Sequence, residues 1–278
     1  MKLIDFILDL LKKIFSKKTT NECDSCSDRD ACAHPIDKSK KYAVIVGLDN
    51  SKLGSCPGAN LDSNNMLGMV SQFVDSNHIV KLNDGKATKF AVVKALQDQI
   101  AKTPEDGIFV FTYSGHGGQM NASSTAKNEI DGKDEFLCLY DNYLIDNDLW
   151  DIFNKCKGKV FVVFDCCHSS TMFSLNGENK ETEEDWKISE TPFFKKFEGV
   201  RAPLKMFVIS GCGEETVSWG DARNGGCLTS SLKRAFNKCL TYSEWWNKAR
   251  NDSSFKSVKQ VPIATRIGSF DLNAKIFN

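Results

Sequence analysis

Long hydrophobic runs are missing from this sequence of 278 residues. No stretch reaches the roughly 18 apolar residues that mark a membrane span. The most hydrophobic windows are short runs such as Ala43–Val46 and Val160–Phe164. An excess of charge is missing as well, because Lys and Arg total 36 and Asp and Glu also total 36. Without a long apolar run, we expect no transmembrane helix. Without a global positive field, we expect no binding of nucleic acid.

What is present is a globular composition, with 41% hydrophobic and 26% charged residues. A chain of this length can form one large domain with appendages. Its eleven cysteines are an odd number, and no secretory signal peptide is recognisable before them. We therefore expect mostly free thiols and a cytoplasmic location. We also expect the protein to be a monomer.

Residues 1–18 show apolar side chains at helical spacing, followed by lysines. This pattern predicts an amphipathic helix. One interpretation is a helix that binds an anionic membrane surface or a partner, since Lys12, Lys13, Lys17 and Lys18 follow the apolar face. The other is a helix docked on its own domain, and the sequence does not decide between them.

A polar, cysteine-bearing segment over 19–40 separates this helix from the main domain. It carries four residues of the types that bind zinc, namely Cys23, Cys26, Cys32 and His34. Four nitrogen and sulfur ligands can close a tetrahedral zinc site. The alternative interpretation is that these cysteines are exposed linker thiols. A zinc site in this appendage is therefore one of two expectations.

From residue 41 onward, apolar runs alternate with helical periodicity. The runs predict strands over 42–48, 79–82, 108–113, 160–165 and 204–210, and helices over 63–74, 88–101, 146–156 and 228–238. Runs such as Ile108–Phe111 lack a two-residue alternation, as expected for strands covered on both faces. The pattern predicts one α/β domain over 41–278, with a doubly wound, mostly parallel sheet and helices on both faces.

Two predicted strands run into unusual polar clusters, Ser114–Gly118 and Asp165–Ser169. Ligands of parallel α/β sheets bind outside the carboxyl ends of the strands, so the fold should bring His116 toward Cys166 and Cys167. A cysteine thiolate beside an imidazole is a strong nucleophile with a proton shuttle. Glycines around His116 leave backbone N–H groups available to an oxyanion. The clusters therefore indicate nucleophilic cysteine chemistry.

At these motifs the sequence resembles the metacaspases, which are caspase-like cysteine peptidases. Tyr113–Gly117 is similar to the family's histidine motif, and Asp165–Ser169 to its cysteine motif. Stretches 129–135, 209–212 and 226–230 also fit, in the same order. The resemblance implies a caspase-like fold over about 41–277, Cys167 as the nucleophile and His116 as the general acid/base. It further implies an oxyanion hole formed by the N–H groups of Gly117 and Cys167.

The resemblance also implies cleavage of protein or peptide substrates after Arg or Lys. Asp165 and Ser114 are similar in position to residues of an acidic specificity pocket, and a carboxylate suits a basic partner. Asp165 has an alternative interpretation as a helix cap. Asp62 is either a second pocket acid or a helix cap.

Some members of the family bind calcium through acidic residues. The corresponding residues here are Asp134, Asp146 and Asp148, but Asn147 and Ser174 replace two expected ligands, so we expect weak binding at most. No cofactor is needed for the chemistry itself.

A long acidic segment over 174–205 interrupts the alternation and predicts a mobile functional loop. Its basic residues are sites for self-processing, with Lys195 and Lys196 favoured among Lys180, Lys187, Lys195, Lys196 and Arg201. An alternative to an active peptidase is a catalytically silent caspase-like scaffold that binds partners through its N-terminal region.

Overall fold

The computed structural model describes residues 36–121, 133–166, 204–212 and 218–277. The predicted N-terminal helix, the cysteine-bearing appendage and nearly all of the acidic segment lie outside these residues. In the part that is described, no helix is both long and apolar enough to cross a membrane.

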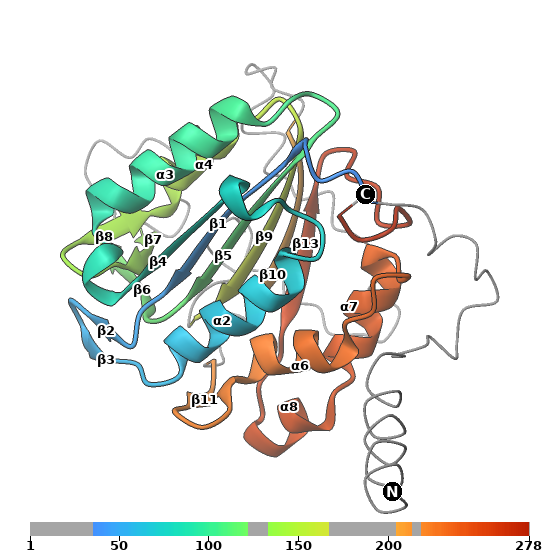
Figure 1. Ribbon diagram of the computed structural model, residues 1–278. Coiled ribbons are helices and arrows are strands. Elements are labelled where there is room, and N and C mark those ends of the chain that lie inside the picture. The colour runs from blue at the N-terminus through green and yellow to red at the C-terminus, as the bar shows by residue number, and fades with distance from the viewer. Residues whose placement is uncertain (1–35, 122–132, 167–203, 213–217, 278) are drawn as a thin grey trace, which may run out of the picture.

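A six-stranded sheet forms the centre of the molecule (Figure 1). Its strands, in spatial order, are β13 (Ile263–Ile267), β10 (Lys205–Ser210), β9 (Lys159–Asp165), β5 (Ile108–Ser114), β1 (Lys41–Gly47) and β4 (Ile79–Asn83). All neighbouring pairs are parallel except β10 and β13, which are antiparallel. The predicted mostly parallel sheet is confirmed.

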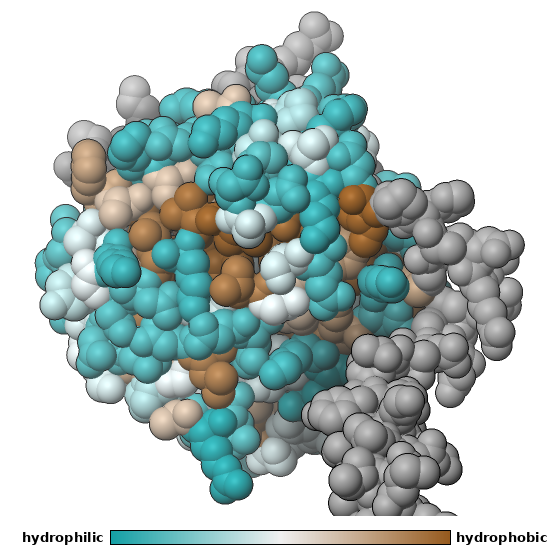
Figure 2. Space-filling model, viewed as in Figure 1, coloured by the Kyte–Doolittle hydropathy of each residue, from teal (hydrophilic) through white to brown (hydrophobic). Residues whose placement is uncertain are grey.

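Helices cover both faces of this sheet (Figure 1). Helices α3 (Lys89–Lys102) and α4 (Asp146–Phe153) pack on one face. Helices α2 (Ala59–Val70), α6 (Cys227–Ala235) and α7 (Tyr242–Arg250) pack on the other, and the short α8 (Ser253–Val258) contacts α6. The doubly wound arrangement is therefore confirmed. Figure 2 shows a mainly hydrophilic surface with a hydrophobic area between α2 and α3, where edge strand β4 is half covered.

Short antiparallel elements follow the strands at the carboxyl end of the sheet. They are the hairpin of β2 (Asn50–Ser51) and β3 (Gly54–Ser55), the pair β11 (Gly220–Asp221) and β12 (Gly225–Gly226), and the small sheet of β6 (Gly117–Asn121), β7 (Lys133–Cys138) and β8 (Tyr143–Ile145). Two short 3₁₀ turns, Ser76–His78 and Asp84–Lys86, flank β4. The short antiparallel elements build loops around the strand ends from which the predicted motifs emerge.

The strands lie within one or two residues of their predicted ranges, because their buried apolar runs carry a strong signal. The helix predicted over 63–74 instead runs over Ala59–Val70 and begins after Gly58, whose φ is 108°. Its first turn mixes apolar and polar residues, Ala59–Asp62, so hydrophobic periodicity did not reveal it. Helices α7 and α8 and strand β13 were not predicted.

Aromatic packing fixes β9 and β10 against α7 and the C-terminal residues. Phe161 is fully buried, and its ring centroid lies 5.8 Å from that of Trp245 and 5.4 Å from that of Phe277. Since β9 also carries Asp165 at its carboxyl end, this packing sets the position of one wall of the site.

We predict that Phe161→Ala lowers the free energy of unfolding by about 3–5 kcal/mol, because it removes a fully buried ring and leaves a cavity. Phe90→Ala is the matched control, since Phe90 is 78% exposed and its removal should change stability by less than about 0.5 kcal/mol. Urea unfolding of both variants measures the difference. Equal effects would contradict the assignment of Phe161 to the core.

Candidate active site

The first residues of the two polar clusters lie side by side at the carboxyl end of the sheet. Ser114, the last residue of β5, pairs in register with Asp165, the last residue of β9. The Gly115 N–H donates to the carbonyl oxygen of Asp165 at 3.4 Å, which holds the two chains together just beyond the strands. His116 therefore stands two residues past one strand, and Cys167 follows two residues past its neighbour.

Backbone carbonyls fix the orientation of His116. Its Nε2 lies 3.0 Å from the carbonyl oxygen of Ser55, in the β2–β3 hairpin. A carbonyl oxygen only accepts hydrogen bonds, so Nε2 carries the proton and Nδ1 keeps its lone pair. The carbonyl oxygen of His116 accepts from the buried Tyr113 hydroxyl at 2.7 Å. The half-exposed imidazole thus presents Nδ1 as a base.

Gly115 links the end of β5 to His116. Its φ is 156°, at the limit of the left-handed range, and a Cβ at this position would lie 2.8 Å from the Tyr113 hydroxyl. Burial raises the pKa of Tyr113 well above its usual value, so the phenol remains a hydrogen-bond donor. Glycine is therefore required here by the close approach of Tyr113.

Cys166 is the last described residue before the predicted nucleophile. Its side chain is 1% exposed and belongs to the hydrophobic core, and its carbonyl oxygen accepts from the Cys212 thiol at 3.5 Å. A buried core thiol is poorly placed to attack a substrate. Cys167 lies outside the described residues, so its assignment as nucleophile remains a prediction.

Two carboxylates converge behind this edge of the sheet. Asp62 in α2 is 1% exposed and accepts a hydrogen bond from the Ser114 hydroxyl at 2.7 Å and from the Gly226 N–H at 2.9 Å. Gly58 precedes the helix as its cap residue. The helix-cap interpretation of Asp62 is therefore wrong, because its side chain binds other elements.

Asp165 is the second carboxylate, with 5% of the residue exposed. It accepts from the Ser218 hydroxyl at 2.7 Å and from the Thr229 N–H at 2.8 Å. Thr229 lies in the first turn of α6, so Asp165 binds the N-terminus of a helix distant in sequence. The residues that directly follow Cys166 lie outside the described part of the chain, so a cap on a helix there stays a prediction. The positive end of the α6 dipole faces both acids, through Gly226 for Asp62 and Thr229 for Asp165.

Glycines at 225 and 226 allow the two carboxylates to pack directly against the chain that leads into α6. A Cβ on Gly225 would lie 2.2 Å from Oδ1 of Asp62, and one on Gly226 would lie 2.1 Å from Oδ2 of Asp165. Gly225 also has a φ of 77°, which other residues rarely adopt. Any side chain here would displace the carboxylates.

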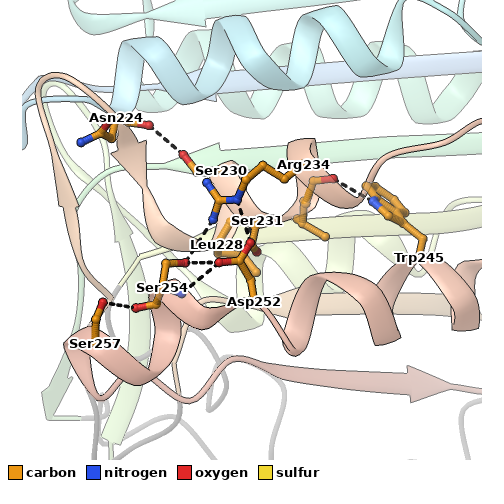
Figure 3. Close-up of polar contacts among 10 residues, drawn as sticks. Asn224, Leu228, Ser230, Ser231, Arg234, Trp245, Asp252, Ser254 and Ser257 are labelled. Atoms are coloured by element: carbon orange, nitrogen blue, oxygen red, sulfur yellow. Dashed lines mark hydrogen bonds and ion pairs between the residues drawn. The ribbon is translucent and has the colours of Figure 1, made fainter. Parts of the chain in front are cut away.

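Polar contacts hold α6 in the position that presents its N-terminus to the acids (Figure 3). The Ser230 hydroxyl donates to the Asn224 carbonyl at 2.7 Å, and Arg234 pairs with Asp252 at 2.7 Å. On its other side, the Trp245 indole N–H donates to the Leu232 carbonyl at 2.9 Å. The helix is thereby anchored to its preceding loop, α7 and the start of α8.

The charge of this acid pair is not matched by a cation. Neither Asp62 nor Asp165 forms an ion pair with any described Lys, Arg or His. Burial, followed by the nearby charge of Asp165, raises the pKa of Asp62 to about 8. Burial also raises the pKa of Asp165, against the hydrogen bonds from Thr229 and Ser218. Within the described part of the chain, the acid pair therefore has no cationic partner.

The predicted metal ligands do not gather in the described part of the chain. No three or more of its His, Cys, Asp and Glu residues are placed to hold a metal ion. Asp148 pairs with Lys89 at 3.1 Å, and Asp146 accepts from the Asn147 N–H. The side chain of Asp134 and the zinc ligands Cys23, Cys26, Cys32 and His34 lie outside the described residues, so both metal expectations stay predictions.

Three contributors to the site were not predicted. The Ser55 carbonyl has no side-chain signal, because any residue supplies a backbone oxygen. Ser218 is a polar residue in a loop and stands out only through its bond to Asp165. Gln260, 3% exposed, donates to the Gly211 carbonyl and accepts from the Trp219 N–H, so it fixes the Ser218 loop.

The caspase-domain family model matches residues 40–270. Among relatives, metacaspase III c of Phaeodactylum tricornutum is 28% identical over 198 residues, which are 60% of this chain and 58% of the relative. Metacaspase-2 of Trypanosoma brucei brucei is 28% identical over 61% of this chain and 53% of its own length. Metacaspase-3 of Arabidopsis thaliana is 30% identical over 51% and 43%. The matches thus span about half the length of these relatives.

Solved structures share the fold. A crystal structure of a Geobacter sulfurreducens protein superposes with a TM-score of 0.64 at 20% identity, over 86% of this chain and 98% of the other. Caspase-1 from Spodoptera frugiperda superposes with a TM-score of 0.54 at 12% identity, over 88% and 94%. The fold, the ordered motifs and the family match lead to one conclusion: this chain belongs to the caspase-domain family of cysteine peptidases, and its relatives there are metacaspases.

Proposed function

We propose that this protein is a cysteine endopeptidase that cleaves protein or peptide substrates after Arg or Lys. The observation that carries the proposal is the buried pair Asp62 and Asp165, which has no cation among the described residues and lies at the strand ends beside His116. An Arg or Lys side chain of a substrate supplies the missing charge.

In the proposed reaction, Nδ1 of His116 takes the proton from the Cys167 thiol. The thiolate attacks the scissile carbonyl carbon, and the resulting oxyanion binds the N–H groups of Gly117 and Cys167. His116 then gives the proton to the leaving amine as the C–N bond breaks. Water, deprotonated by His116, hydrolyses the thioester and restores the thiol.

The residues around the acid pair support a basic specificity. The groups that contact Asp62 and Asp165 are neutral donors, namely Ser114, Ser218, Gly226 and Thr229. A guanidinium or ammonium group gains charge-assisted hydrogen bonds from the two carboxylates. An acidic side chain at the same place would add a further acid to a buried pair that already has no cation among the described residues, so cleavage after Asp is not expected.

Thiol and imidazole suffice for this chemistry, and no metal takes part in the proposed steps. Weak calcium binding by Asp134, Asp146 and Asp148, and zinc binding by the appendage, are accessory proposals. We further propose a cytoplasmic monomer in which residues 1–18 contact a membrane surface or a partner. A catalytically silent scaffold is the competing function, and titration with a thiol-alkylating active-site reagent distinguishes it.

We predict that Cys167→Ala abolishes peptide cleavage, whereas Cys166→Ala retains most of it, because the Cys166 thiol is buried in the core. His116→Ala should lower kcat by roughly 10²–10⁴ through loss of the proton shuttle. Steady-state cleavage of an arginyl peptide measures all three. Loss of activity in Cys166→Ala with retention in Cys167→Ala would reverse the assignment.

We also predict that Asp62→Asn and Asp165→Asn each lower kcat/KM for arginyl substrates by about tenfold to a hundredfold. This range corresponds to the roughly 1.5–3 kcal/mol of one hydrogen bond to a charged group. Asp98→Asn, which changes an exposed carboxylate on α3, is the matched control and should be neutral. Preferential cleavage after Asp by the unaltered protein would contradict the proposed specificity.

The last prediction concerns self-processing within 174–205. The active protein should cut itself after a basic residue of this segment, with Lys195 or Lys196 favoured because Phe193 and Phe194 precede them. Intact-mass spectrometry should show the cut in the active protein and not in Cys167→Ala. If the active protein cleaves peptides while remaining a single chain, self-processing is not part of its function.

A further inference from the structure

A row of lysines crosses the sheet at the end opposite the catalytic motifs. Lys41 in β1 pairs in register with Ile108 in β5, Ile108 with Lys159 in β9, and Lys159 with Lys205 in β10. Residues in register share a face of the sheet, and the next residues of this face, such as Ala43 and Phe161, belong to the core beneath α2 and α7. The lysines therefore border that core at the amino ends of the strands.

Lys41 is unusual among them because it is buried without a partner. It is 7% exposed, and its ammonium group makes no hydrogen bond or ion pair with any described residue. Lysine is rarely buried to this extent unless it is paired. Burial lowers the pKa of Lys41 to about 8. The charge of Asp37 raises this pKa, and the charges of Lys159 and Lys38 lower it. At neutral pH the ammonium is thus mostly charged and poorly solvated.

Lys41 lines a cavity of about 280 Å³, together with Lys40, Lys159, Asp37, Asp106, Gly107 and Ile108. Two acids also line its border, and only one of them is paired with a cation among the described residues. Asp106 pairs with Lys40 at 2.5 Å, and Asp37 accepts from the hydroxyl and N–H of Ser39. Burial lowers the pKa of Lys159, and the nearby charge of Asp271 raises it in part. The cavity therefore keeps the positive charge of Lys41 without a direct counter-ion.

We propose that this cavity is a binding site for a small phosphate dianion, either inorganic phosphate or the phosphate group of a small monoester. A dianion would pair with Lys41 and Lys159 at once and satisfy the buried ammonium. Lysine is a common phosphate ligand because its ammonium is a compact charge with three donors. The site lies at the far end of the strands from His116, so it is separate from peptide cleavage.

The test is a phosphate titration of the full-length Cys167→Ala chain in phosphate-free buffer, followed by calorimetry and thermal unfolding. We expect saturable binding of one phosphate per chain in the millimolar range or tighter. Lys41→Met and Lys159→Met should each weaken it by about tenfold or more, as one charge-assisted contact is lost. Glycerol 3-phosphate in a parallel titration distinguishes the two sources, since tighter binding than inorganic phosphate indicates a monoester.

Lys94→Met is the matched control, because it removes an equal charge from the exposed Lys94–Asp98 pair on α3. General stabilisation by phosphate through exclusion from the surface affects every variant equally and cancels in this comparison. In phosphate-free buffer, Lys41→Met should also raise Tm, because an apolar side chain replaces an unpaired buried ammonium.

The proposal is overturned if millimolar phosphate fails to bind, or if Lys94→Met weakens binding as much as Lys41→Met and Lys159→Met. If Lys41→Met does not fold, Lys159→Met decides the outcome alone. Peptide cleavage by Lys41→Met in the catalytically intact chain should match that of the unaltered protein. This result separates failure of the phosphate site from failure of the proposed peptidase function.

Discussion

The site depends on two buried carboxylates held at the N-terminus of one helix. Asp62 and Asp165 come from α2 and β9, yet both accept hydrogen bonds from the first residues of α6 and its cap. The helix dipole and these donors make the negative charge tolerable, but burial still raises the pKa of each carboxyl group. In the proposed function, this balance is what favours a cationic side chain of the substrate over a neutral one.

The parallel sheet brings this acid pair and the imidazole together. Ser114 and Asp165 end neighbouring strands in register, so Ser114 reaches Asp62 while the chain two residues later presents His116. The hairpin of β2 and β3 then orients the ring through the Ser55 carbonyl. The proposed recognition and chemistry thus share the carboxyl end of the sheet, whereas the lysine row crosses its amino end.

The sequence predicted the parts that depend on local pattern. Buried strands such as Val160–Asp165 appear as apolar runs, and the polar clusters that follow them have recognisable compositions. The role of Asp62 was left open, because a carboxylate directly before a predicted helix, here 63–74, is also a common N-cap. Its contacts with Ser114 and Gly226 span 52 and 164 residues of sequence, so only the folded chain decides between the two interpretations. Backbone contributions, such as the Ser55 carbonyl, have no sequence signal at all.

The central claim is that the acid pair awaits a cationic side chain, and carboxyl ¹³C NMR titration tests it most directly. The Cys167→Ala chain is titrated with and without agmatine, a guanidinium compound that mimics an arginine side chain, and Asp62→Asn assigns the signal. Without agmatine, the Asp62 carboxyl should titrate near its raised pKa of about 8. Bound guanidinium favours the charged carboxylate, so the pKa should fall and binding should release a proton between that value and the new one. An Asp62 titration that saturating agmatine leaves unchanged, or one near the ordinary value of about 3.9 in the free protein, would contradict the account.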